Sequence, residues 1–424
     1  MMSPKSTEHR FVWLTSIRWL PVGIMFASTI LLPVERGLST LEVGTLLAIQ
    51  GFAVLGLELP SGSLSDTIGR RPVLITSGML AILATTLFLL ANDFWGFALS
   101  FVMQGVFRAL ESGSLESWFV DTVHAQNLAA ELSRPLAAAN TALGVAIACG
   151  ALAGGLLTWW NPFTDLSALA LPVLVATACY IFYTALCFFL VRDHEPRPVK
   201  LRFGERVREL RTSLREVPNA TRDGLRLAAT SRVLRGLIFV ELFWALALVG
   251  FEALTPLRLG ELLPSEQQAA ALFGVASAAG WLCFAAGSFV AGIASTRIGN
   301  VWMAILSRLL NGAFVVLIGV AAGPVGVITA FGLSYLTHGL AGPAHSALLH
   351  GCANTHTRAT VLSLNSMVSG GAYSLGLLAL TAFAEVGSLS FAIIAAGGLS
   401  LLGALCYLPA LAEARRATHA PLHP

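Results

Sequence analysis

The chain has 424 residues, of which 56% are hydrophobic and 12% are charged, and its mean hydropathy is +0.75. Soluble domains carry about twice this share of charged residues, and a soluble chain this apolar could not cover its surface with polar groups. The composition therefore excludes an ordinary soluble protein and indicates one whose exterior faces hydrocarbon, while the net charge of +3 indicates little by itself.

The sequence begins with the polar stretch MMSPKSTEHR, which leads into an apolar segment without a small-residue cleavage site. We expect a retained cytoplasmic tail rather than a cleaved signal peptide. A membrane-spanning helix needs about 20 apolar residues to cross roughly 30 Å of hydrocarbon. Twelve segments of this kind are predicted, near residues 11–33, 42–64, 72–91, 94–120, 135–160, 167–191, 235–258, 268–295, 300–322, 324–349, 359–383 and 386–410.

One long polar segment separates the two sets of six spans. From Arg192 to Arg235 it holds twelve basic and six acidic residues. With the N-terminus inside, nearly all other basic residues fall on the same side, and the main exceptions are Arg36 and Arg258. The positive-inside rule then puts both termini and this segment in the cytoplasm, with the chain in the cell membrane. We interpret the segment as an amphipathic loop helix near anionic lipid headgroups rather than a nucleic-acid patch.

The two halves of the chain repeat. The stretch GSLSDTIGRR, from Gly62 to Arg71, follows the second predicted span, and GIASTRIG, from Gly292, follows the eighth span 230 residues later. This predicts an all-α polytopic membrane protein with two pseudo-symmetric six-helix bundles. The predicted parts are an N-terminal bundle at 1–191, a basic cytoplasmic linker at 192–234, and a C-terminal bundle with a short cytoplasmic tail at 235–424.

The stretch from Gly62 to Arg71 resembles the loop motif G-x-L-[SA]-D-x-x-G-R-[RK] of the major facilitator superfamily. It lies between the second and third spans on the cytoplasmic side, where this family has it. With the span count, the central loop and the weak second copy, the resemblance covers nearly the whole chain. It implies a secondary transporter in which two bundles alternate access to a central cavity.

The motif also has a physical interpretation. Its glycines permit close helix approach and a tight turn, and its aspartate can face the N-terminus of a neighbouring helix. Its two arginines can pair with Asp121 at the cytoplasmic end of span four. The resemblance implies that these contacts form an inner gate, whereas the alternative is that the arginines are only positive-inside anchors. The candidate gate residues are Gly62, Asp66, Gly69, Arg70, Arg71 and Asp121.

Span four contains Gln104 and Gly105, followed by Arg108 and Glu111. The family usually has an arginine three residues before the Gln-Gly pair, where this chain has Phe101, so that motif is broken. Arg108 lies one turn beyond the pair and could do similar work. At spacing i, i+3 it shares a helix face with Glu111.

Span five contains the segment GALAGG at residues 150–155. It is similar to the G-P-x-x-G-G core of exporters that exchange a drug for a proton, with alanine in place of the proline. A small-residue face for helix packing explains the segment equally well.

Charged side chains inside the spans each cost roughly 2.5–3.5 kcal/mol unless they pair or face water. A buried carboxylate can bind and release a coupling proton, and Glu111, modulated by Arg108, is the first choice. Arg18 and Glu58 fall at similar depth and could pair, although Glu58 could equally serve the gate. Glu252 could simply be solvated near the outer face. The candidate proton and cargo residues are Glu111, Arg108, Glu58, Arg18, Glu241 and Glu252.

Other chemistry is not indicated. The histidines at 338, 345, 350 and 356 do not place three rings on one helix face, so no metal site is expected. The six cysteines are scattered in apolar stretches and indicate buried thiols rather than disulfides. Trp244 or Phe251 could line a cargo cavity, but nothing in the sequence selects them. No nucleotide-binding motif is present, and no cofactor is expected.

The predicted function is proton-coupled efflux of a drug-like or metabolite cargo, as in antiporters that confer drug resistance. The expected partners are the small-molecule cargo, protons and the lipid bilayer, with no nucleic acid and a monomeric chain. A proton-coupled uptake symporter for a nutrient would use the same scaffold. A membrane-embedded enzyme would need a nucleophile or metal constellation that the sequence lacks, and a non-transporting receptor is a further alternative.

Overall fold

The structure of the chain is a computed structural model that describes residues 4–125, 132–163, 165–192, 226, 229, 231–352 and 358–419. The regular elements in these residues are all helices. Eleven helical stretches in the described part are long and apolar enough to cross a membrane. The chain is therefore an all-α, multi-pass membrane protein, which confirms the prediction from composition.

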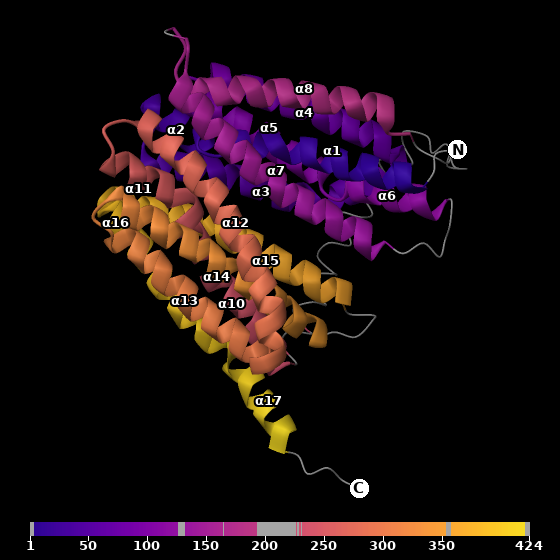
Figure 1. The fold of residues 1–424 in the computed structure, drawn as a ribbon, viewed down its shortest axis with the longest axis vertical. Coiled ribbons are helices and arrows are strands. Elements are labelled where there is room, and N and C mark those ends of the chain that lie inside the picture. The colour runs from indigo at the N-terminus through magenta and orange to yellow at the C-terminus, as the bar shows by residue number, and fades with distance from the viewer. Residues whose placement is uncertain are drawn as a thin grey trace. The chain divides into compact units, whose positions relative to one another are not determined.

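Every span predicted in the first half corresponds to helical structure (Figure 1). The second, third, fifth and sixth predicted spans are single helices, whereas the first and fourth are each made of two. The helices are α1 (Pro4–Ile24), α2 (Ser28–Glu35), α3 (Thr40–Ile68), α4 (Arg70–Leu90), α5 (Phe94–Glu111), α6 (Ser114–His124), α7 (Ser133–Trp160) and α8 (Ala170–Leu190).

The second half follows the same plan. Its first predicted span is interrupted by a short π-helical segment, and its last by a 3₁₀ turn at Ala404–Tyr407. The helices are α10 (Arg232–Leu248), α11 (Leu254–Leu262), α12 (Glu266–Ile298), α13 (Asn300–Val320), α14 (Pro324–Gly351), α15 (Arg358–Val386), α16 (Leu389–Gly403) and α17 (Leu408–His419).

The predicted span at 94–120 is not among the eleven long apolar helices. It is built from α5 and α6, which are separated at Gly113, a residue with a φ of 71°. Glycine adopts this left-handed conformation without the steric cost that other residues meet. The helix pair α5 and α6 therefore takes the place of the fourth predicted span.

The π-helical segment Val249–Ala253 lies between α10 and α11. Segments of this kind are rare and often occur at functional sites, because the extra residue re-aims the side chains around it. This segment contains Phe251, a predicted cavity-lining residue, and Glu252, a predicted proton-binding residue.

The helices separate into two compact units. Unit 1 contains α1, α2 and α4 to α8, and unit 2 contains α10, α11 and α13 to α17. Two long helices are divided: α3 belongs to unit 2 up to Ala48, and α12 belongs to unit 1 up to Ala278. Each half of the chain therefore contributes the start of one long helix to the unit that the other half builds.

The starts of these two helices pack through equivalent glycines. A Cβ atom on Gly44 of α3 would lie 2.2 Å from Thr381 Oγ1 of α15, within unit 2. A Cβ on Gly274 of α12 would lie 2.6 Å from both Ala151 O and Gly155 Cα of α7, within unit 1. The two glycines are 230 residues apart, so the sequence repeat extends to helix packing.

The turns before α4 and α13 repeat in the same way. Gly69 has a φ of 101° and Gly299 a φ of 80°, and each directly precedes its helix. Residues that have a Cβ atom rarely adopt these φ values. Both copies of the loop motif therefore end in a turn that requires glycine.

Arg36 and Arg258, the two exceptions to the positive-inside rule in the predicted topology, each contact the end of a helix. Arg36 Nη1 donates to the carbonyls of Phe88 and Ala91, where α4 ends, and Arg258 Nη2 donates to Ala321 O, 3.2 Å away, where α13 ends. The last carbonyls of a helix have no partner inside it and carry a partial negative charge. Each arginine therefore caps the third helix of its half.

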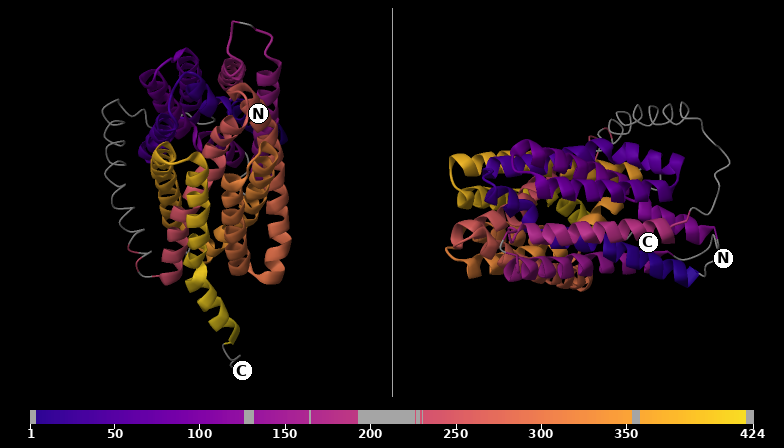
Figure 2. Two further views of the ribbon diagram at one scale, coloured as in Figure 1. Left: turned by 90° about the vertical axis from the view of Figure 1, so that its left-hand side faces the viewer. Right: turned by 90° about the horizontal axis from the view of Figure 1, so that it is seen from above.

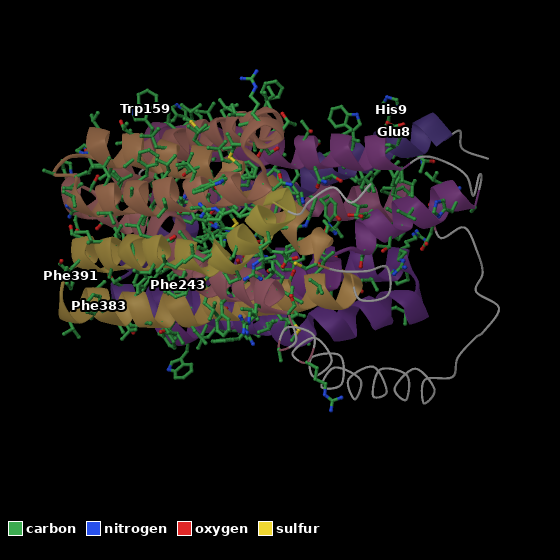
Figure 3. The ribbon with its side chains drawn as sticks, turned by 90° about the horizontal axis from the view of Figure 1, so that it is seen from below. Glu8, His9, Trp159, Phe243, Phe383 and Phe391 are labelled. Carbon is green, nitrogen blue, oxygen red and sulfur yellow. The ribbon has the colours of Figure 1, made fainter. Side chains whose placement is uncertain are left out.

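Large apolar side chains cover much of the exterior, as expected for helices in contact with lipid. Trp159, near the end of α7, is 73% exposed and extends outward (Figure 3). Phe383 and Phe391 pack against each other, with ring centroids 5.2 Å apart, where α15 ends and α16 begins (Figure 3). The C-terminal helix α17 extends beyond the ends of the other helices of unit 2 (Figure 2).

Candidate functional site

Unit 1 contains a buried ion pair. Arg18 Nη2 of α1 lies 3.0 Å from Glu111 Oε2 at the end of α5, and the two residues are 2% and 9% exposed. The Arg18 guanidinium also lies 4.4 Å from the centre of the Phe107 ring, a cation–π contact. Its Nε and Nη1 atoms are buried without a hydrogen-bond partner in the described part of the chain. Two charges are therefore held deep in the unit with incomplete compensation.

Tyrosines of α8 border this pair. Tyr180 packs edge-on against Phe107, with centroids 5.5 Å apart, and both Tyr180 and Tyr183 are buried. The hydroxyl of Tyr183 interacts with the thiol of Cys187, one turn further along α8.

The sequence had proposed other partners for these residues. It paired Arg18 with Glu58, whose side chain lies outside the described residues, and it assigned Arg108 to modulate Glu111. The structure pairs Glu111 with Arg18, while Arg108 lies on the exposed side of α5. The spacing i, i+3 shows only that Arg108 and Glu111 are neighbours along one helix, and the partner comes from another.

Unit 2 contains a larger buried network around Glu241 of α10. Glu241 Oε1 lies 3.6 Å from Arg308 Nη2 of α13 and 3.2 Å from His345 Nε2 of α14. Glu241 is 5% and Arg308 3% exposed. The other ring nitrogen, His345 Nδ1, lies 2.8 Å from the hydroxyl of Tyr407. One carboxylate is thus shared between a fixed positive charge and a titratable ring.

The partners of His345 indicate which nitrogen carries the proton. Nε2 faces two acceptors, Glu241 Oε1 and, at 3.4 Å, Asn365 Oδ1. In the neutral ring, Nε2–H therefore donates to these oxygens, and Nδ1 accepts from the Tyr407 hydroxyl. A second proton on the ring would turn the Glu241 contact into an ion pair. The sequence considered His345 only as a metal ligand and missed this role.

Six aromatic rings in unit 2 form a closed circuit. Going round it, successive centroids lie 4.6 to 6.0 Å apart. The Arg308 guanidinium lies over the Trp244 ring at 3.9 Å, so the circuit adjoins the Glu241 network. In order, the rings are Trp244, Phe251, Tyr335, Trp281, Phe284 and His338.

Glu252, a candidate from the sequence, also belongs to this region. Its Oε1 accepts a 3.0 Å hydrogen bond from the Tyr335 hydroxyl. The residue is half-buried in the π-helical segment beside Phe251. Glu252 and Glu241 thus adjoin different members of the same circuit.

The loop motif of the first half brings one of its two arginines to Asp121. Arg70 Nε lies 3.2 Å from Asp121 Oδ2. Arg71 instead donates to Phe188 O, at 2.9 Å, and stacks on the Phe188 ring. The carboxylate of Asp121 is 57% exposed, so this ion pair is one that water can easily replace. The side chains of Gly62 and Asp66 lie outside the described residues.

The glycines of span five pack against other helices. A Cβ on Gly150 would lie 2.3 Å from Leu20 O, and one on Gly154 would lie 2.2 Å from Ile24 O, both in α1. Gly155 faces the start of α12. The segment therefore serves as a small-residue packing face, one of its two proposed interpretations.

Comparisons with known proteins agree with this architecture. The family model described as Major Facilitator Superfamily matches residues 19–282, more than half of the chain. The chain belongs to this superfamily, and that class consists of transporters rather than enzymes. A curated relative, the uncharacterized MFS-type transporter YhjO of Bacillus subtilis (strain 168), is 28% identical over 135 residues. That match covers 31% of this chain and 33% of the relative's own length.

Solved structures share the fold. The nucleoside transporter NupG superposes with a TM-score of 0.73 at 12% identity, covering 95% of this chain and 98% of its own. A POT family transporter in complex with 5-aminolevulinic acid has a TM-score of 0.69 at 12% identity and covers 95% of each chain. At these identities the likeness establishes the fold alone and leaves the cargo of this chain open.

Proposed function

We propose that the chain is a secondary transporter of a small organic molecule that exports a drug-like or metabolite cargo in exchange for protons. The observation that carries this proposal is a buried cluster of opposite charges in each unit, Arg18 with Glu111 and Arg308 with Glu241. Charges inside a membrane protein are costly and generally mark ion or cargo pathways. Membership in the superfamily supports transport by alternating access in the cell membrane, with both termini cytoplasmic.

In this proposal Glu111 carries the coupling proton. Ionised, it is held by Arg18, and protonated, it releases the arginine. A free guanidinium in a buried place is unfavourable until another anion or water reaches it. Proton binding would thus be linked to a change of partner for Arg18, which is what coupling requires. Glu241, shared between Arg308 and His345, can act in the same way in unit 2.

The remaining assignments from the sequence complete the proposal. The chain would act as a monomer of two bundles, 1–191 and 235–424, joined by the cytoplasmic linker 192–234. The motif around Asp66, with the exposed Arg70–Asp121 pair, would form the inner gate. Asp66→Asn should slow transport severalfold with little change in cargo affinity, and a wild-type rate would argue against the gate.

The proton role can be tested in proteoliposomes with an imposed pH gradient. Purified Glu111→Gln protein should lose pH-driven transport while still exchanging cargo between the two sides, because glutamine cannot release a proton. Glu116→Gln, in the exposed part of α6, is the matched control and should behave as wild type. Unaltered pH-driven transport by Glu111→Gln would remove this residue from the proton role.

The direction of transport needs a separate test. Expression in a cell that lacks efflux pumps should raise its tolerance to amphipathic compounds if the chain exports them. The competing proposal is proton-coupled uptake of a nutrient on the same scaffold. Unchanged tolerance together with raised accumulation of a nutrient would favour uptake.

A further inference from the structure

The aromatic circuit of unit 2 differs from an ordinary core. Trp244, Phe251 and Tyr335 are buried, but Trp281 and Phe284 on α12 and His338 on α14 are only half-buried. The circuit therefore has a buried base and an accessible edge. Ring faces on such an edge offer a planar molecule apolar contact without further rearrangement.

The circuit also holds polar atoms that the surrounding helices leave without partners. Trp281 Nε1 and His338 Nδ1 are buried and unbonded in the described part of the chain, and so are Nε and Nη1 of Arg308. An indole N–H and a guanidinium can only donate hydrogen bonds. A buried donor left unpaired costs about 1–3 kcal/mol, so a ligand that brings acceptor atoms would remove a cost already present.

The charges make the two ends of the circuit different. Arg308 adjoins the circuit at Trp244, whereas the Glu252 carboxylate adjoins it at Tyr335. Glu241, the ion-pair partner of Arg308, lies closer to His345 than to the guanidinium. The Arg308 end therefore suits an anionic group, and the Glu252 end suits a hydrogen-bond donor. Charge-assisted hydrogen bonds to a guanidinium are among the strongest that a ligand can make.

We infer that this circuit and Arg308 form a binding site for a planar aromatic acid, with its carboxylate at Arg308 and its ring against Trp281, Phe284 and His338. This inference rests on the proposed transport function and names the chemical class of its cargo. It also explains why Glu241 is shared between Arg308 and His345: a bound carboxylate can take its place at Arg308, and Glu241 then keeps His345 as its partner.

Equilibrium binding to the purified full-length protein in detergent, measured by titration calorimetry, tests the site. The probes are indole-3-acetate, its neutral amide, its cationic counterpart tryptamine, the N-methylated acid, and cyclohexylacetate. Indole-3-acetate should bind at least tenfold more tightly than the amide and cyclohexylacetate. Tryptamine should bind more weakly still. The N-methylated acid should bind severalfold more weakly than indole-3-acetate, because it has no indole N–H to donate to the Glu252 carboxylate.

Two variants locate the site within unit 2. Arg308→Gln should abolish the preference for the acid over the amide. Phe284→Leu should weaken the binding of indole-3-acetate and of its amide about equally. Phe284→Leu removes only a half-buried ring, so it keeps the test valid if Arg308→Gln does not fold. Phe289→Leu, on the outside of the same helix and 72% exposed, should leave binding unchanged.

The outcomes separate this inference from the proposed function. Equal binding of acid and amide by the wild type, tightest binding of tryptamine, or insensitivity to Phe284→Leu would each overturn the aromatic-acid site. If pH-driven transport of another compound persisted in that case, the transporter proposal would stand alone. Selective binding of the acid without any transport in proteoliposomes would support the site and count against the proposed function.

Discussion

The two units of the molecule share an arrangement of helices, which we call the frame. They differ in their polar centres, the buried ion pairs with the side chains around them. In unit 1, one arginine and one glutamate form a pair, and a separate aromatic cluster of Phe88, Phe97 and Phe101 consists of buried apolar rings. In unit 2, Glu241 joins an arginine, a histidine and, through the histidine, a tyrosine. The aromatic circuit there carries nitrogen and oxygen atoms that adjoin this network.

The shared features are those that the backbone dictates. The glycine pairs 44 with 274 and 69 with 299 recur at the 230-residue spacing of the two halves, and Arg36 and Arg258 cap the ends of α4 and α13. Each of them answers a steric or hydrogen-bonding requirement that both halves inherit with the same helix arrangement. Polar side chains inside a unit meet no such common requirement, so they could diverge and acquire separate functions.

Removing one arginine from each centre should produce the largest difference in stability between the two units. Arg18→Met leaves Glu111 buried without its charge partner, which typically costs about 3–5 kcal/mol of stability. Arg308→Met should cost less, about 1–3 kcal/mol, because Glu241 keeps His345. Equilibrium unfolding in mixed detergent micelles measures both values.

The double variant Arg18→Met with Glu111→Met serves as the control. It replaces the pair by apolar side chains and should recover most of the stability that the single variant loses. Equal losses for Arg18→Met and Arg308→Met would show that His345 does not support Glu241, and the two centres would then be alike in their energetics.

The glycine contacts at the starts of α3 and α12 give the next largest effect. Gly274→Ala would force its Cβ against backbone atoms of α7, which cannot move aside alone, and overpacking of this kind costs about 1–3 kcal/mol. Gly44→Ala meets the side chain of Thr381, which can rotate if it gives up its hydrogen bond to Leu377, so a loss of about 1 kcal/mol is expected.

Glycines on the same helices provide the matched controls for this experiment. Among the described residues, no atom outside the helix's own backbone lies within 4 Å of a Cβ built on Gly56 of α3 or Gly292 of α12. Alanine there should stabilise the protein by up to about 1 kcal/mol, because alanine favours the helix over glycine. Opposite signs for Gly274→Ala and Gly292→Ala in thermal unfolding would confirm that the cost arises from the helix contact.

The frame could be read from the sequence to a large extent, because its signals are local. Apolar length predicted the spans, and the repeated glycines at 69 and 299 marked two turns that do have positive φ. The breaks inside the spans were not predicted. Gly113 alone does not show that α5 ends there, and no pattern of single residues identifies the π-helical segment at 249–253.

The polar centres could be predicted only in part. The rule that intramembrane charges must pair points to Arg18, Glu111 and Glu241, which do lie in buried ion pairs, but partners in a bundle come from helices far apart in the sequence. Depth along a span does not tell which face a side chain occupies, so depth alone pairs Arg18 with Glu58 and does not find its contact with Glu111. Arg308 and His345 lie inside predicted spans of the second half. A search of these spans for groups that could balance the charge of Glu241 would have found them.

The smallest expected effect concerns the arginine caps, and it tests whether the frame is equivalent in the two halves. Arg36→Gln and Arg258→Gln each remove a positive charge from the C-terminal carbonyls of α4 and α13, which is typically worth about 0.3–1 kcal/mol. Arg258 is also bridged to Glu261 at 2.7 Å, and this exposed pair should add little. The two variants should therefore lose similar amounts in thermal unfolding.

Arg232→Gln is the control for this comparison, because its exposed guanidinium lies at the start of α10, where a helix offers a cation no favourable dipole. If Arg36→Gln and Arg258→Gln match it, the caps are incidental and the two arginines need another explanation. If Arg36→Gln and Arg258→Gln both unfold at a lower temperature than Arg232→Gln, by the same margin, helix geometry explains why these two arginines depart from the predicted charge rule. Each positive charge is then retained on that side of the membrane because a helix ends beside it.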